Sequence, residues 1–154
     1  MTTDKSNQSA AGHFSPAPDP RPDVTAAVTR GASSLLVDMG YAPFTELTLP
    51  NGRRADITGL SDKGTIVMVE VKSCRQDFEV DHKWPEYRAY CDQFFFAVNE
   101  DFDTDLLPQD EGLIIADGFG GAVIREAITS RIAAARRKSM LIRLARLAIF
   151  RTQI

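Results

Sequence analysis

The sequence contains few of the residues from which disulfide frameworks and zinc sites are built. Its 154 residues include two cysteines and two histidines. Two cysteines cannot complete a structural zinc site by themselves, and they do not provide the dense cross-links of small secreted domains. We therefore expect a protein of a reducing compartment whose fold depends on an apolar core.

Long apolar runs are also missing. No stretch approaches the roughly 18 uninterrupted apolar residues of a membrane-spanning helix, and the first residues lack the apolar core of a secretory signal. The apolar fraction of 44% and the charged fraction of 25% are ordinary for a soluble globular protein. These features predict a cytoplasmic protein without a membrane segment.

The chain divides into a short tail and one domain. Residues 1–20 are rich in Ser, Ala and Pro and poor in large apolar side chains. Such a segment buries too little surface to offset its ordering entropy, so we expect it to be disordered. Residues 21–154 are numerous enough for a single domain with a substantial core.

The net charge of −3 conceals an uneven distribution. Residues 127–154 contain seven basic residues and no acidic one, which leaves −10 for residues 1–126. The pattern predicts a basic helix over about 130–151, with apolar residues among its arginines. Three roles fit such a helix: contact with nucleic-acid phosphates, binding to a membrane or a partner protein, and packing with a solvated outer face.

Turn signals and apolar periodicity predict an α/β fold. The order is a helix, three strands, a helix and a strand, followed by two more strands and the basic helix. The expected ranges are helix 22–39, strand 44–49, a hairpin within 53–73, helix 84–91, strands 93–98, 112–116 and 121–124, and helix 130–150.

Residues 53–73 form the hairpin around which the rest is organised. Its two Ile-, Val- and Thr-rich runs flank the turn signal Ser61-Asp62-Lys63-Gly64. A three-residue loop, with Gly64 in the left-handed conformation, closes such a turn. That loop places Ser61 opposite Thr65.

The same register gathers charged residues at the open end of the hairpin. Asp56 faces Glu70, and Lys72 lies two residues further along the same face. The second strand is apolar on both faces apart from Glu70 and Lys72, which predicts a buried central strand where unpaired charge is costly.

The preceding turn decides whether Glu46 joins this group. A three-residue loop of Pro50, Asn51 and Gly52 places Glu46 opposite Asp56, on the acidic face. A two-residue Asn51-Gly52 turn shifts the pairing by one and sends Glu46 to the other face. We favour the first register.

Crowded carboxylates repel one another unless a cation or lysine lies nearby, and this cost is the physical reason to interpret the cluster as a site. Carboxylate oxygens are the ligands that Mg²⁺ and Mn²⁺ prefer. The alternative is structural: Glu70 and Lys72 pair across strands with Asp56 and Arg54, as charged residues of sheets often do.

Asp56, followed on the next strand by Glu70-Val71-Lys72, resembles the D…(D/E)xK signature of the PD-(D/E)xK nuclease superfamily. Three longer segments resemble the MmcB family of bacterial DNA-repair proteins: GRRADI, VEVKS and DFEVDHKWPEYRAYCDQFFFAV. Ala55 replaces the proline of "PD", and the following helix has no clear Q-x-x-x-Y motif. The resemblance implies a restriction-endonuclease-like αβββαβ core, a mixed central sheet flanked by helices.

The resemblance also implies roles for individual residues. Asp56, Glu70 and the backbone carbonyl of Val71 would bind Mg²⁺ or Mn²⁺. In the register favoured above, Glu46 adds a third carboxylate for a second ion. Lys72 would orient the attacking water or stabilise charge that develops on the phosphate.

Basic and aromatic residues beyond the hairpin are candidates for DNA contact. Cations of this kind bind phosphates, and aromatic rings stack on unpaired bases. For Trp84 and Tyr87 the alternative is a packing role between helix and sheet. The candidates are Lys83, Trp84, Tyr87 and Arg88, together with Arg136, Arg137 and Lys138 in the terminal helix.

The sequence thus predicts a metal-dependent nuclease that acts on DNA in repair, with DNA and other repair proteins as partners. The first alternative is a catalytically silent DNA-binding subunit of a repair complex. The second is a protein–protein adaptor that acts through the basic terminal helix.

Overall fold

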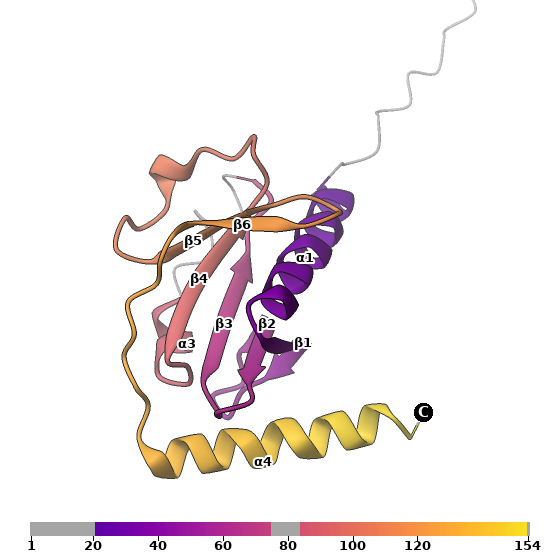
Figure 1. Ribbon diagram of the computed structural model, residues 1–154, viewed down its shortest axis with the longest axis vertical. Helices are drawn as coiled ribbons and strands as arrows, with labels where there is room; N and C mark the ends of the chain where they lie inside the picture. Colours follow the sequence, from indigo (N-terminus) through magenta and orange to yellow (C-terminus); the bar gives the residue numbers. More distant parts are fainter. Residues whose placement is uncertain (1–20, 75–83, 154) are drawn as a thin grey trace, which may run out of the picture.

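Six strands form one mixed sheet in the order β1-β2-β3-β4-β5-β6 (Figure 1). The computed structural model describes residues 21–74 and 84–153, so the tail 1–20 and Lys83 lie outside the described residues. The elements are α1 (Arg21–Asp38), β1 (Tyr41–Thr48), β2 (Arg54–Ser61), β3 (Ile66–Val71), α3 (Pro85–Arg88), β4 (Gln93–Val98), the 3₁₀ turn η1 (Thr104–Leu106), β5 (Gly112–Ala116), β6 (Gly121–Arg125) and α4 (Ala134–Arg151).

Neighbouring strands pair in the mixed pattern that this order implies. β1, β2 and β3 are antiparallel, β3, β4 and β5 are parallel, and β6 returns antiparallel to β5. With α1 before β1 and α3 between β3 and β4, the expected αβββαβ core is confirmed. Within the described part of the chain, no helix has the length and apolar character needed to cross a membrane.

The β2–β3 hairpin has the predicted register. Ile57 pairs with Val69, and the Ser61 N–H donates to the Thr65 carbonyl at 3.0 Å. Gly64 has a φ of 86°, in the left-handed region that glycine tolerates without strain. The three-residue loop is therefore confirmed.

The β1–β2 connection is also the three-residue loop. The Leu49 N–H donates to the Arg53 carbonyl at 2.7 Å, and Gly52 has a φ of 84°. β1 begins earlier than predicted and includes Pro43, which pairs with Gly59. Proline is tolerated there because β1 is an edge strand, whose outer side needs no ladder donor.

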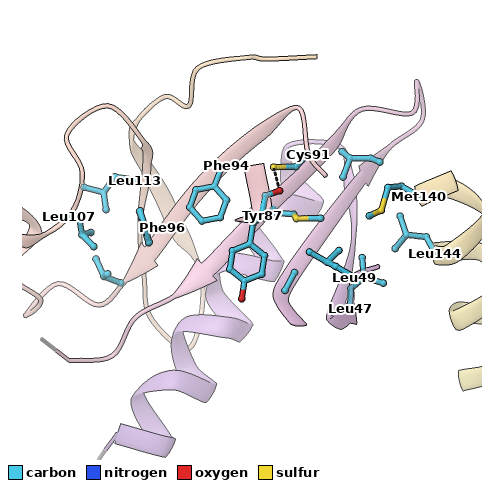
Figure 2. Packing of buried hydrophobic residues seen from close by; sticks show 14 of the residues in the cluster. Leu47, Leu49, Tyr87, Cys91, Phe94, Phe96, Leu107, Leu113, Met140 and Leu144 are labelled. Carbon is cyan, nitrogen blue, oxygen red and sulfur yellow. Dashed lines mark hydrogen bonds between the residues drawn. The ribbon is translucent and has the colours of Figure 1, made fainter. Parts of the chain in front are cut away.

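Alternation along β3 separates two cores. Val67 and Val69 point to the face covered by α1, where Val28 and Leu36 are buried. Ile66 and Met68 point to the opposite face, which α3, α4 and the loop after β4 cover (Figure 2). Because both faces are covered, every residue of β3 is buried, as predicted.

The terminal helix begins at Ala134, four residues later than predicted. Residues 130–133 do not continue it, because the Ser130 N–H donates to the Asp92 carbonyl and the Ile132 N–H to the Asp92 side chain. From there α4 lies across one end of the sheet (Figure 1).

Candidate active site

The β2–β3 pairing ends beside two carboxylates. The backbone pairing ends at Ile57 and Val69. Beyond it, carboxyl side chains, rather than backbone carbonyls, accept the hydrogen bonds from the backbone N–H groups. The Val71 N–H donates to Asp56 Oδ2 at 2.8 Å, and the Asp56 N–H donates to Glu70 Oε1 at 3.2 Å. The two acids therefore lie together between the strands, each held by the other strand's backbone.

The group is deeply placed. Glu70 is 4% exposed and Lys72 is 5% exposed, whereas Asp56 is half-buried. The Lys72 N–H donates to the Ala97 carbonyl at 3.0 Å, so pairing with β4 fixes the backbone that carries the lysine. Access from solvent is therefore best at Asp56.

Burial, followed by the negative charge of Asp56 and a hydrogen bond with its side chain, raises the pKa of Glu70 to about 9. The Asp56 N–H and the nearby Lys72 ammonium act in the other direction, but they do not compensate. Glu70 thus keeps its proton at neutral pH.

The donor set suits a hard divalent cation. Mg²⁺ sites commonly use one or two carboxylates and keep several waters, so Asp56, Glu70 and a backbone carbonyl are sufficient. No group of three or more Asp, Glu, His or Cys side chains that could hold a metal occurs within residues 21–74 and 84–153. The described residues therefore offer a site with two carboxylates.

Glu46 does not join this group, although its register is as expected. Its φ of 57° is left-handed, and its side chain is exposed. Phe44 and Leu47 contact the same core although they are three residues apart, a spacing that in a regular strand points to opposite faces. The chain therefore turns over at Glu46, and the expected third carboxylate is absent from the described cluster.

A similar reversal occurs opposite, on β2. Ala55 and Ile57 are two residues apart, yet they pack in different cores. Asp56 lies between them, at the position that faces Glu46 in the register. The irregularity of both strands thus coincides with the place where Asp56 reaches across to β3.

Two hollows in the described surface lie elsewhere. One, of about 640 Å³, lies between α1 and the β5–β6 turn, and the other, of about 670 Å³, lies beside Arg88 and the start of α4. Neither is lined by Asp56, Glu70 or Lys72.

The aromatic candidates for DNA contact pack inside the protein. Tyr87 is buried and stacks on Phe94 with ring centroids 6.2 Å apart (Figure 2). Its hydroxyl donates to the Arg54 carbonyl. Trp84 is partly buried and contacts the rings of Phe94 and Phe96. These contacts favour the packing alternative for both residues.

Most of the basic candidates make contacts within the protein. Arg88 forms an ion pair with Glu111. Arg136 donates to the Ala89 carbonyl at 2.9 Å, whereas Lys138 is exposed.

Arg137 forms a contact that the sequence did not indicate. Its two terminal nitrogens each donate to Asp92 at 2.7 Å, and Nη1 also donates to the Gly64 carbonyl at 2.8 Å. Burial alone would raise the pKa of Asp92, but the bonds from Arg137, Ile66 and Ile132 outweigh burial and lower it to about 2. The only signal in the sequence was a lone acid directly before the apolar strand 93–98.

Comparisons with known proteins point to one family. A family model described as DNA repair protein MmcB-like matches residues 15–154. A protein of unknown function from Silicibacter pomeroyi is 37% identical, with 84% of this chain and 89% of that chain covered and a TM-score of 0.81. A repair endonuclease from Pyrococcus abyssi is 15% identical, with 46% and 34% covered and a TM-score of 0.33, a similarity too slight to argue from. No curated protein gives a significant match.

Proposed function

The chain belongs to the DNA repair protein MmcB-like family, and from this premise we propose that it hydrolyses DNA phosphodiester bonds with Mg²⁺ or Mn²⁺ as cofactor. The proposal depends on the buried corner where β2 and β3 exchange hydrogen bonds through Asp56 and Glu70. Burial and the charge of Asp56 raise the pKa of Glu70, and perturbed pKa values of this kind cluster at functional sites, which supports a role in chemistry.

Asp56, Glu70 and the carbonyl of Val71 are the residues that would hold the ion. A bound divalent cation supplies positive charge to the phosphate and lowers the pKa of a bound water. The fit rests on the chemistry of the donors: two hard oxygen ligands lie together at a place where the ionised form of Glu70 is disfavoured, as its raised pKa indicates.

Lys72 supplies positive charge that already acts on Glu70. Its burial limits the water that could screen it, which strengthens its electrostatic effect on a nearby phosphate. We assign it the orientation of the attacking water or the stabilisation of charge that develops on the phosphate.

The test is a cleavage assay with purified protein, Mg²⁺ or Mn²⁺, and single-stranded, duplex, flap and junction DNA. Asp56→Ala and Lys72→Ala should each reduce the cleavage rate by about 100-fold or more, the usual scale for loss of a preorganised electrostatic group. Asp62→Ala and Lys63→Ala are matched controls, because both residues are exposed at the β2–β3 turn and should leave the rate unchanged.

Absence of cleavage on all four substrates, or equal cleavage by the wild type and both site variants, would rule out the catalytic proposal. DNA binding without cleavage would instead support the silent DNA-binding subunit. A second readout separates metal binding from turnover: Mn²⁺ should raise the melting temperature of the wild type and of Asp62→Ala, but not of Asp56→Ala.

A further inference from the structure

The outer side of α4 carries large apolar side chains that the described chain leaves uncovered. Ile142, Ile149 and Phe150 are 50%, 59% and 59% exposed. On the inner side of the same helix, Met140 and Leu144 are buried against the sheet (Figure 2). The helix is therefore apolar on two sides, and only one of them is packed.

Helical geometry places Ile142 and Ile149 in one stripe with two cations. At about 100° per residue, Lys138, Ile142, Arg146 and Ile149 fall within roughly a quarter of the helix circumference, opposite the buried Leu144. The stripe alternates cations and large apolar residues along most of the helix. Lys138 and Arg146 are themselves exposed.

The other basic residues of α4 hold the helix in place. Arg143 donates to the Thr48 carbonyl at 3.2 Å, and Arg151 donates to the Thr45 and Glu46 carbonyls at 2.6 and 3.2 Å. Arg136 and Arg137 make the contacts described above. The positive charge of α4 thus divides into an inner set that anchors the helix to the protein and an outer pair beside the apolar stripe.

We infer that the stripe of Lys138, Ile142, Arg146 and Ile149 docks an acidic amphipathic helix of another protein. Residues 127–154 contain no acidic residue, so charge complementarity requires a partner with negative charge. Because Ile142 and Ile149 are apolar, the partner must also present an apolar surface that covers them. This surface is separate from the proposed nuclease site and does not depend on it.

Other occupants fit less well. A second copy of α4 would bring further cations and no acidic residue to the surface, and like charges disfavour association. DNA phosphates would satisfy the cations but leave Ile142 and Ile149 in water. A membrane surface calls for a broad apolar face, whereas the second apolar side of α4 is already packed against the sheet.

The probe is a labelled 18-residue helical peptide with leucines along one face and flanking glutamates, matched in length to α4. Its affinity for the full chain is measured by fluorescence anisotropy, beside a scrambled isomer of the same composition. Ile142→Ser/Ile149→Ser should weaken binding about tenfold or more, because two buried apolar side chains are lost. The matched control is Ile124→Ser/Ile128→Ser, which replaces isoleucines that are 57% and 60% exposed away from α4 and should leave affinity unchanged.

A charge swap provides the second arm. Lys138→Glu/Arg146→Glu should lose the glutamate peptide and bind the corresponding lysine peptide instead, a gain that misfolding cannot produce. Equal affinity of wild type and Ile142→Ser/Ile149→Ser, or no preference over the scrambled isomer, overturns the inference. If Ile142→Ser/Ile149→Ser keeps peptide binding but loses duplex DNA or phosphatidylglycerol vesicles, the surface belongs to nucleic acid or membrane and the inference is also overturned.

Discussion

Glu70 and Asp92 are both almost fully buried acids at opposite ends of β3, yet their surroundings drive their pKa values in opposite directions. Asp92 accepts hydrogen bonds from the Ile66 and Ile132 N–H groups and from both terminal nitrogens of Arg137. Glu70 accepts one bond from the Asp56 backbone and lies beside the Asp56 carboxylate.

The difference separates a charge that the surrounding donors stabilise from one that its surroundings disfavour. Hydrogen-bond donors stabilise the ionised form of Asp92. Through these bonds Asp92 connects the start of β3, the segment before α4 and α4 itself. The ionised form of Glu70 is opposed by burial and by a like charge, so its place in the fold requires a proton or a cation. The following predictions test that contrast.

The largest effect is expected at Asp92. Asp92→Ala should lower the free energy of unfolding by about 3–5 kcal/mol, because it leaves the Arg137 guanidinium and two backbone N–H groups without their acceptor. Urea denaturation measures the loss. Asp62→Ala, an exposed turn acid, should change stability by less than about 0.5 kcal/mol. A loss below 1 kcal/mol for Asp92→Ala would mean that the bonds to Asp92 contribute little to stability.

Glu70→Gln should have the opposite sign. Without divalent metal, the neutral isostere should raise the free energy of unfolding at pH 8, because the wild type must keep Glu70 protonated at a cost of about 1.4 kcal/mol for each pH unit above its unfolded pKa. The pKa of Glu70 is raised, so its contribution is complete below about pH 4.5 and is lost as the pH rises toward 9. Urea denaturation in EDTA from pH 5 to 9 should therefore show a falling wild-type stability and a flatter curve for Glu70→Gln. Parallel curves would contradict the buried proton.

Acid should reveal the reverse behaviour at Asp92. The pKa of Asp92 is lowered, so its contribution is present above about pH 3.8 and is lost as the pH falls toward 2. The stability difference between wild type and Asp92→Asn should therefore shrink by about 1–2 kcal/mol between pH 4 and pH 2. A difference that stays constant over this range would show that the carboxylate's charge is not what stabilises this corner.

Local chemistry was enough to predict the hairpin and the pairing of Asp56 with Glu70. Gly52 and Gly64 each identify a left-handed position, and the alternation of Val67, Met68 and Val69 fixes which side chains share a face. One residue of slip would have moved Glu70 to the other face, so these short-range signals also determine the geometry of the candidate site.

Long-range contacts were not predictable in the same way. Asp92 and Arg137 are 45 positions apart, and nothing in either neighbourhood indicates the other. The arginines of α4 suggested a surface for phosphates, but several of them serve as anchors to backbone carbonyls. Glu46 shows that the correct strand register does not by itself predict the direction of a side chain. The β1–β2 register is as predicted, but the left-handed backbone of Glu46 changes where its side chain points.

The smallest effect is expected at the exposed ion pair of Arg53 and Glu86, whose N–O distance is no longer than that of the buried Arg137–Asp92 pair. Arg53 Nε lies 2.6 Å from Glu86 Oε2, with 31% and 47% of the two side chains exposed. Glu86→Ala should lower the free energy of unfolding by no more than about 1 kcal/mol, because water solvates and screens both charges before and after the change. Added salt should reduce even this difference, which urea denaturation at 50 and 500 mM NaCl would measure. A loss as large as that of Asp92→Ala would mean that distance rather than burial sets the strength of these ion pairs, and the contrast between Asp92 and Glu70 would lose its physical basis.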